Sequence, residues 1–132
     1  MSCMSLTLKT IPGSFAICRM LARTPLPDWF NQPGPNGFSS ISWTDDELSI
    51  VCEESMVPET VQCERGWRCL MLQGPFAFDL TGILLKVLQP LAAASIGIFA
   101  VSTFDTDYVL VKDHAFAQAK QALLESGLHL IE

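Results

Sequence analysis

Two segments of the chain resemble each other at a spacing of about 60 residues, and this repeat limits the folds that the chain can adopt. Ser42–Val51 aligns with Ser102–Val111 at an offset of 60, and Gly13–Ala16 aligns with Gly74–Ala77 at an offset of 61. Internal repeats are typical of chains built from similar structural modules. We therefore interpret the 132 residues as two diverged halves, with chance similarity of short strands as the alternative.

The second half has the pattern of a βαββαβ unit. Apolar residues at three- and four-residue spacings predict helices over 83–92 and 116–123, the second of which ends at Gly127. Asp79 or Thr81 is the candidate N-cap of the first helix, and Asp113 is that of the second. Runs rich in β-branched and aromatic residues predict strands at 67–73, 98–104, 108–111 and 128–131. The fold class is therefore α+β and ferredoxin-like, in which an antiparallel sheet carries both helices on one face.

The first half keeps the strands of this pattern and loses a helix. Four prolines between Pro25 and Pro35 exclude a long regular helix there, and 55–62 has room for one short helical turn. We expect a degenerate half at 1–65 and a complete half at 66–132, packed as one compact unit because about 60 residues bury little surface alone. The expected strands are Leu6–Thr10, Phe15–Met20, Phe38–Trp43 and Leu48–Cys52.

Composition narrows the class of protein. The chain is 49% hydrophobic and carries a formal charge of −6, which disfavours both disorder and nucleic-acid binding. No run of about 20 apolar residues predicts a membrane span, and the first residues lack the apolar segment of a secretory signal. Five cysteines at irregular spacings indicate reduced thiols. We expect a cytoplasmic protein without a membrane partner.

Several segments resemble the tandem ACT-domain proteins of bacteria, and they are similar to the ACT modules of the animal arginine sensor CASTOR. The resemblance rests on Phe38–Cys52, Gly66-Trp67, Gly82–Leu84 and, most specifically, Ser102–Val111. It implies ferredoxin-like modules that bind an amino acid or a similar small effector at an interface between modules. It also implies a sensor that regulates another protein and has no catalytic activity of its own.

A free amino acid requires hydrogen-bond donors for its carboxylate and acceptors for its ammonium at close range. Gly82 lies at the start of the first predicted helix, where unpaired backbone N–H groups favour an anion. Thr103 and Asp107 flank the predicted hairpin and offer acceptors. The resemblance assigns ligand contacts to Gly82, Thr103, Phe104 and Asp107. The remaining candidates lie beside the helix start or on the opposing wall: Asp79, Thr81, Ile83, Ser42 and Thr44.

Each candidate also has a purely structural interpretation. Asp107 is a common type of residue for stabilising a tight turn, and Asp79 is a common N-cap. Gly82 permits close packing of a helix on a sheet. The acidic residues Asp45–Glu47 form a solvated turn in the alternative interpretation.

The sequence offers little for catalysis. The two histidines have no nucleophilic Ser or Cys in an elbow motif beside them, and Cys63 and Cys69 lack a nearby histidine at zinc-ligand spacing. We expect no metal and no cofactor. The leading hypothesis is a regulatory protein that binds an amino acid and acts on a protein partner, and the alternative is an assembly module that binds no metabolite. Either is expected to form a homodimer through its sheet.

Overall fold

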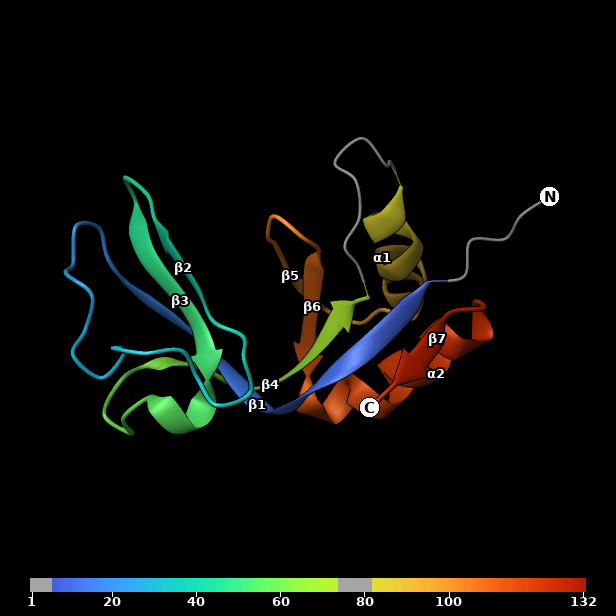
Figure 1. Cartoon of the computed structure of the whole chain (residues 1–132), viewed down its shortest axis with the longest axis horizontal. Helices are drawn as coiled ribbons and strands as arrows, with labels where there is room; N and C mark the ends of the chain where they lie inside the picture. Colours follow the sequence, from blue (N-terminus) through green and yellow to red (C-terminus); the bar gives the residue numbers. More distant parts are fainter. Residues whose placement is uncertain (1–5, 74–81) are drawn as a thin grey trace. The chain divides into compact units, whose positions relative to one another are not determined.

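The computed structural model describes residues 6–73 and 82–132 (Figure 1). In this part of the chain the α-helices are α1 (Ile83–Ala93) and α2 (Phe116–Glu125), and 3₁₀ turns lie at Glu54–Met56 and Asp113–Ala115. The strands are β1 (Thr7–Leu21), β2 (Ser40–Trp43), β3 (Glu47–Glu53), β4 (Cys63–Leu72), β5 (Phe99–Ser102), β6 (Asp107–Lys112) and β7 (His129–Ile131).

The chain divides into two compact units. Unit 1 combines the chain up to Ile11 with Arg68–Glu132, and unit 2 is Pro12–Trp67. The beginning of β1 therefore belongs to the same unit as the second half of the sequence, and β1 and β4 each contribute residues to both units. The boundaries of the two units thus differ from those of the predicted halves 1–65 and 66–132.

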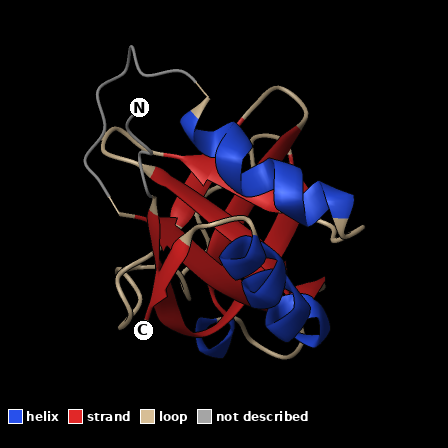
Figure 2. Cartoon of the chain, turned by 90° about the vertical axis from the view of Figure 1, so that its right-hand side faces the viewer, coloured by secondary structure: helices blue, strands red, loops and turns tan. Residues whose placement is uncertain are grey.

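Unit 1 has the predicted order of elements. From β4 onward the chain runs β4-α1-β5-β6-α2-β7, which is a βαββαβ order, and α1 and α2 lie together on one side of its strands (Figure 2). The first residues of β1 add a strand to this pattern. They pair with β7 in parallel, with Thr7 opposite His129, and β1 also neighbours β4 in the sheet.

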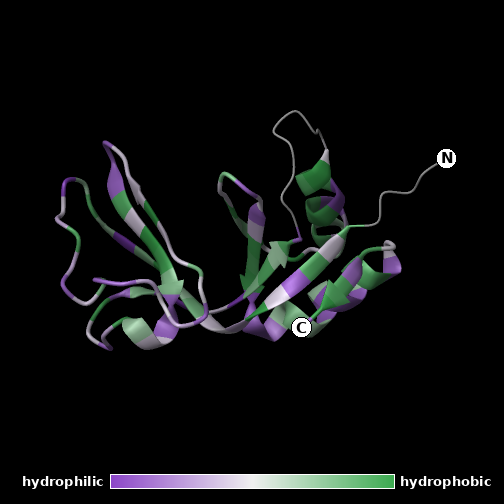
Figure 3. Ribbon diagram, in the orientation of Figure 1, coloured by the Kyte–Doolittle hydropathy of each residue, from purple (hydrophilic) through white to green (hydrophobic). Residues whose placement is uncertain are grey.

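The core of unit 1 lies between its helices and its strands. One face of each helix is buried, as the spacing of apolar residues predicts. Figure 3 shows apolar green stretches interrupted by polar purple ones along both helices. Leu8, Leu70 and Val109 complete the core from the strand side. The buried helix residues are Ile83, Val87, Leu91, Phe116, Ala119 and Leu123.

The ends of α2 confirm one prediction and correct another. Gly127 follows the helix with φ +95°, a left-handed conformation that glycine adopts without strain, and the Leu128 N–H donates to the Leu123 carbonyl at 3.1 Å. The prediction that Asp113 caps α2 is wrong. The N-cap residue is Ala115, because a 3₁₀ turn separates Asp113 from the helix. The carboxylate of Asp113 instead accepts from Arg68 Nη1 at 3.3 Å.

Unit 2 contains an antiparallel set of strands. β1 pairs with β3 from Phe15 opposite Glu53 to Leu21 opposite Glu47, and β3 pairs with β2. The proline-containing segment forms no helix between residues 22 and 39, as predicted. Its side chains cover the strands: Phe30 joins a buried cluster that includes Ala16, Cys18, Leu48, Ile50, Cys52 and Val57.

β1 corrects the prediction of two separate strands at 6–10 and 15–20. It is one strand of 15 residues that passes through Pro12 and Gly13. Pro12 lacks the N–H that a ladder requires, but it lies between the ladder with β7 at residues 7–9 and the ladder with β3 at 15–21. Gly13 supplies the positive φ of +96° at this change of partner.

No helix in the described part of the chain is long and apolar enough to cross a membrane.

Candidate functional site

The candidate residues of unit 1 lie on a hairpin that is tied to the end of β4. β5 and β6 are joined by four residues, closed by a hydrogen bond from Thr103 N–H to the Thr106 carbonyl at 2.8 Å. The Thr106 side chain is buried, and its Oγ1 donates to the carbonyl of Leu72 at 2.6 Å. This bond holds the turn against the last residue of β4.

The turn presents polar and aromatic groups to solvent. Thr103 Oγ1 donates to the Thr106 carbonyl at 3.1 Å, and the Phe104 side chain is 79% exposed. Asp107 lies opposite Ser102 in the ladder, and its carboxylate accepts from the Ser102 hydroxyl. The hairpin therefore offers a carboxylate held by a local hydrogen bond beside an exposed aromatic ring.

Gly82 begins α1 in a left-handed conformation. It is the N-cap residue, with φ 76°, and within 6–73 and 82–132 no side chain caps this end of the helix. A Cβ at Gly82 would meet none of the described residues within 4 Å, so close packing of the helix on the strands is not the reason for the glycine. The left-handed backbone conformation is the reason for the glycine, because β-branched residues are strained at positive φ. The Ile83 side chain belongs to the core, which leaves only its backbone N–H for a ligand.

The start of α1 and the β5–β6 turn lie at the same end of the unit 1 strands (Figure 1). The helix start supplies N–H donors, and the turn supplies oxygen acceptors, which are the two kinds of group that a zwitterion requires. Asp79 and Thr81 lie outside the described residues.

The other two candidates, Ser42 and Thr44, belong to unit 2. Ser42 is in β2, and Thr44 begins the β2–β3 turn, where its N–H donates to the Glu47 carbonyl at 2.9 Å. This is the same closure as in the β5–β6 turn, with Thr44 in the place of Thr103 and Glu47 in the place of Thr106. At the turns the structural offset is therefore 59 residues rather than 60. Glu47 is consequently not the counterpart of Asp107.

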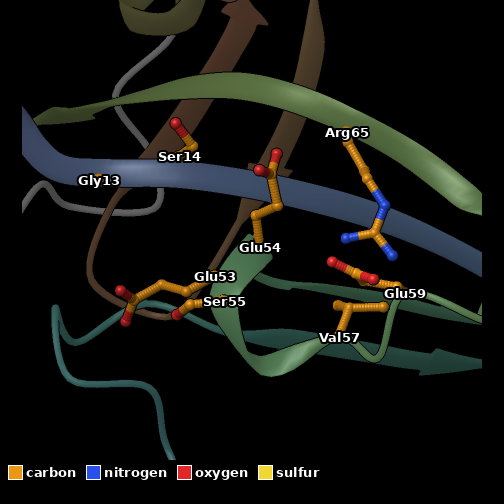
Figure 4. A pocket seen from close by; sticks show the side chains of 8 residues that line it. All are labelled: Gly13, Ser14, Glu53, Glu54, Ser55, Val57, Glu59 and Arg65. Carbon is orange, nitrogen blue, oxygen red and sulfur yellow. The ribbon is translucent and has the colours of Figure 1, made fainter.

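Unit 2 also contains an open cavity of about 450 Å³ that the sequence reasoning missed (Figure 4). Two of its charged side chains, Glu54 and Arg65, make hydrogen bonds to the backbone of unit 2. The Glu54 carboxylate accepts from the Gly66 N–H at 2.8 Å, and Arg65 Nη2 donates to the carbonyl of Pro58 at 2.9 Å. We do not assign a ligand to this cavity. It is lined by Gly13, Ser14, Glu53, Glu54, Ser55, Val57, Glu59 and Arg65.

Comparison with known proteins identifies the family. The family model for the ACT domain matches residues 62–125, which include β4, α1, β5, β6 and α2, and a model for an N-terminal domain matches 13–60. The chain is 30% identical to the cytosolic arginine sensor for mTORC1 subunit 1 of Pongo abelii over 111 residues, or 76% of this chain. The chain belongs to the ACT-domain family.

The curated relatives are longer than this ACT-domain protein. The chain spans 34% of the Pongo abelii sensor. It is also 36% identical to the Homo sapiens protein of the same name, over 43% of this chain and 18% of that protein. The chain thus corresponds to about a third or less of the length of the relatives it matches.

Solved structures share the fold of the ACT-domain protein. The crystal structure of the Agrobacterium tumefaciens protein Atu0741 is 44% identical, with a TM-score of 0.87, and the alignment covers 96% of this chain and 92% of that one. A Vibrio cholerae protein described as a possible transport protein has a TM-score of 0.73 at 17% identity, covering 93% and 91% of the two chains. At that identity the likeness concerns the fold alone.

We predict that Thr106→Val weakens the hairpin of the ACT domain. Valine has nearly the same shape but leaves the buried Leu72 carbonyl without this donor, which costs about 1–3 kcal/mol of the free energy of unfolding. Chemical denaturation measures this loss. Thr103→Val, at an exposed position of the same turn, is the matched control and should cost less than about 1 kcal/mol. Equal stability of Thr106→Val and the parent protein would contradict the assignment.

Proposed function

We propose that this ACT-domain protein is a cytoplasmic regulatory protein that binds a free amino acid and transmits its occupancy to a partner protein, without a reaction of its own. Two findings support the proposal. The ACT domain model matches unit 1, and the curated relatives are named as cytosolic arginine sensors. We further propose that no cofactor, nucleic acid or membrane takes part.

The geometry of the β5–β6 hairpin in unit 1 is the main support for the proposed site. The bond from Thr106 Oγ1 to the Leu72 carbonyl fixes the turn, and the Asp107 carboxylate lies at its base, where it accepts from the Ser102 hydroxyl. We propose that Asp107 receives the ligand ammonium and that the backbone N–H groups after Gly82 receive its carboxylate. The Phe104 ring, exposed at the tip, then contacts the apolar part of the ligand.

Ser42 and Thr44 are proposed to contribute through the second copy of the module. The same turn closure in unit 2 supports the interpretation that the halves 1–65 and 66–132 descend from one ACT-like module. Arrangements of two modules around one ligand are a feature that the family resemblance implies. We therefore propose that the β2–β3 turn of unit 2, with Ser42 and Thr44, is a second ligand-binding turn of the same kind.

A panel of free amino acids and common nucleotides tests the proposal directly. A ligand present at about 100 times its dissociation constant should stabilise the folded state by about 2.7 kcal/mol, which thermal shift detects. Isothermal titration of the strongest responder then gives its affinity. A flat response across all twenty amino acids would contradict the proposed function.

We predict that Asp107→Asn weakens binding of the amino acid found in this panel. The change keeps an oxygen acceptor for the Ser102 hydroxyl and removes the charge that faces the ammonium. A hydrogen bond to a charged group contributes about 1.5–3 kcal/mol, so affinity should fall about 10- to 150-fold at an unchanged melting temperature. Titration calorimetry measures this difference.

Asp105→Asn is the matched control for Asp107→Asn, since it removes the same charge from the same turn at an exposed position. It should bind the ligand with the affinity of the parent protein. An unchanged affinity in Asp107→Asn, or an equal loss in both variants, would remove Asp107 from the site.

A second candidate function, a protein-assembly module, is favoured by large apolar side chains on the surface. Leu21 is 76% exposed and Trp43 is 56% exposed, both in unit 2. Such side chains favour a protein contact, and we propose a homodimer as its simplest form. Light scattering at micromolar concentration tests the dimer. A monomer together with a response in the amino-acid panel would exclude this second function.

A further inference from the structure

We propose that unit 2 contains a peroxide-sensitive pair of cysteines, in which Cys63 reacts first and Cys18 then closes a disulfide between β4 and β1. This pair is distinct from the proposed amino-acid site, because Cys18 and Cys63 lie in β1 and β4, whereas the proposed ligand contacts lie on the β5–β6 hairpin, at the start of α1, and in β2 and the turn that follows it.

The two thiols meet on neighbouring strands. Cys18 is in β1 and Cys63 is in β4, and these strands are adjacent in the sheet. The Cys18 side chain is fully buried, and Cys63 packs against the cluster that contains it. A side-chain hydrogen bond between Cys18 and Cys63, which favours the protonated Cys18 thiol, also contributes to the raised pKa of Cys18. Both sulfurs are free thiols, so the pair is available for oxidation.

Cys63 is the thiol that a small oxidant reaches. It is partly exposed and lines a cavity of about 360 Å³ together with Ile17, Arg19, Gln62 and Glu64. The lining is mostly polar, which suits a water-like molecule such as hydrogen peroxide. Cys18 and Cys52 are both buried without exposed surface, so neither is the first point of attack.

The strand order explains why Cys18 rather than Cys52 is the partner of Cys63. β1 lies between β3 and β4, so Cys52 in β3 and Cys63 in β4 are not on neighbouring strands. Two strands that flank a third are about 9–10 Å apart, beyond the Cα separation of about 7 Å that a disulfide tolerates. The described residues contain no group of three potential ligands that would hold a metal ion, so the thiols do not form a metal centre in this part of the chain.

The chemistry needs one molecule of hydrogen peroxide. The sulfur of Cys63 attacks one peroxide oxygen, the O–O bond breaks, and the products are a sulfenic acid at Cys63 and one water. The sulfur of Cys18 then displaces the hydroxyl group of that sulfenic acid, and its proton leaves with the hydroxyl as a second water. Two thiols are oxidised to one disulfide, and one peroxide is reduced to two waters.

The second step is expected to be the slower one. Burial, and then the neighbouring Cys63 and Cys52, raise the pKa of Cys18 to about 12, so its thiolate is scarce at neutral pH. The sulfenic acid at Cys63 should therefore persist long enough to react with dimedone, a reagent specific for sulfenic acids.

Peptide mapping tests the proposal in the full chain, in a Cys3→Ser background because Cys3 lies outside the described residues. Combined cleavage by trypsin and a glutamyl endopeptidase separates the three thiols of unit 2. Cys18 falls in 10–19, Cys52 in 48–53 and Cys63 in 60–64. After hydrogen peroxide and without reductant, peptides 10–19 and 60–64 should appear linked by a disulfide. Absence of this linked species, or linkage of 60–64 to 48–53, would overturn the proposal.

Three variants sharpen the result. Cys18→Ala should lose the linked peptide and accumulate a dimedone adduct at Cys63, whereas Cys63→Ala should lose both products. Cys52→Ala is the matched control at an equally buried position of the same cluster and should behave like the parent protein. Circular dichroism verifies that each variant is folded, and Cys18→Ser replaces Cys18→Ala if the alanine variant unfolds. A folded Cys18 variant that still forms a disulfide at Cys63 would also overturn the proposal.

Discussion

Replacement of Glu53 by leucine is expected to lower the free energy of unfolding by about 3 kcal/mol, because two partly buried donors would lose a charged acceptor. The Glu53 side chain is only 4% exposed at the end of β3. Its two carboxylate oxygens accept from Asn36, one from the backbone N–H at 2.8 Å and the other from Nδ2 at 2.7 Å. This pair holds the proline-containing segment of unit 2 against the strands.

A double-mutant cycle separates the interaction between Glu53 and Asn36 from the effect of losing either side chain alone. Urea denaturation is measured for four proteins: the parent, Glu53→Leu, Asn36→Ala and the double variant. Once Asn36 is alanine, Glu53→Leu should cost clearly less, since the Nδ2 donor is no longer left without its acceptor. Glu59→Leu, on an exposed residue of the same cavity, is the control and should change stability by less than about 1 kcal/mol. A Glu53→Leu protein as stable as the parent would refute a structural role for the carboxylate.

A marked loss of stability between pH 9 and pH 12 is the second large effect that we expect. Burial raises the pKa of the Cys69 thiol from 9.0 to about 12, which corresponds to about 4 kcal/mol. Above pH 9 the unfolded chain loses this proton while the folded chain retains it. The stability contributed by the thiol is therefore complete below pH 9 and is lost progressively as the pH rises through 12.

Urea unfolding at closely spaced pH values measures this loss as a slope. Each buried thiol contributes up to about 1.4 kcal/mol per pH unit, and burial raises the pKa values of Cys18 and Cys52 as well. Cys69→Ala removes one of these contributions, so its slope should be shallower than that of the parent whatever its stability at neutral pH. Identical slopes in the two proteins would show that Cys69 does not retain its proton.

Local patterns predicted much of unit 1. The helical spacing of Ile83, Val87 and Leu91 depends only on which side of a helix is buried, and Gly127 marks a helix end by its own conformational freedom. The course of β1 could not be read in this way. Pro12-Gly13 resembles a turn, and only the change of ladder partners in the folded sheet explains why a strand passes through it.

In the candidate site, too, features with a local sequence pattern were predictable, and contacts between distant residues were not. The sequence located the hairpin and its acidic residues, but the hydrogen bond from Thr106 to Leu72 joins residues 34 positions apart and has no local signature. The repeat is visible in the sequence, where identical residues align at an offset of 60. The equivalent hydrogen bonds of the two turns align at an offset of 59 instead, and residue identity does not reveal this difference. The positive φ of Gly82 is likewise visible only in the structure. A valine at this position would strain the backbone, so its effect on binding would not report on ligand access alone.

The pairing of β1 with β7 also affects when the protein can fold during its synthesis. Thr7 to Lys9 pair with residues 129–131, which the ribosome adds about 120 residues later. Until then the first strand has no β7 to pair with, so the last step of unit 1 assembly follows the synthesis of residue 131. Contacts of such long sequence separation slow folding. A nascent chain arrested before residue 129 should consequently remain more sensitive to proteases than the full chain extended by a C-terminal linker that carries residue 131 out of the ribosome.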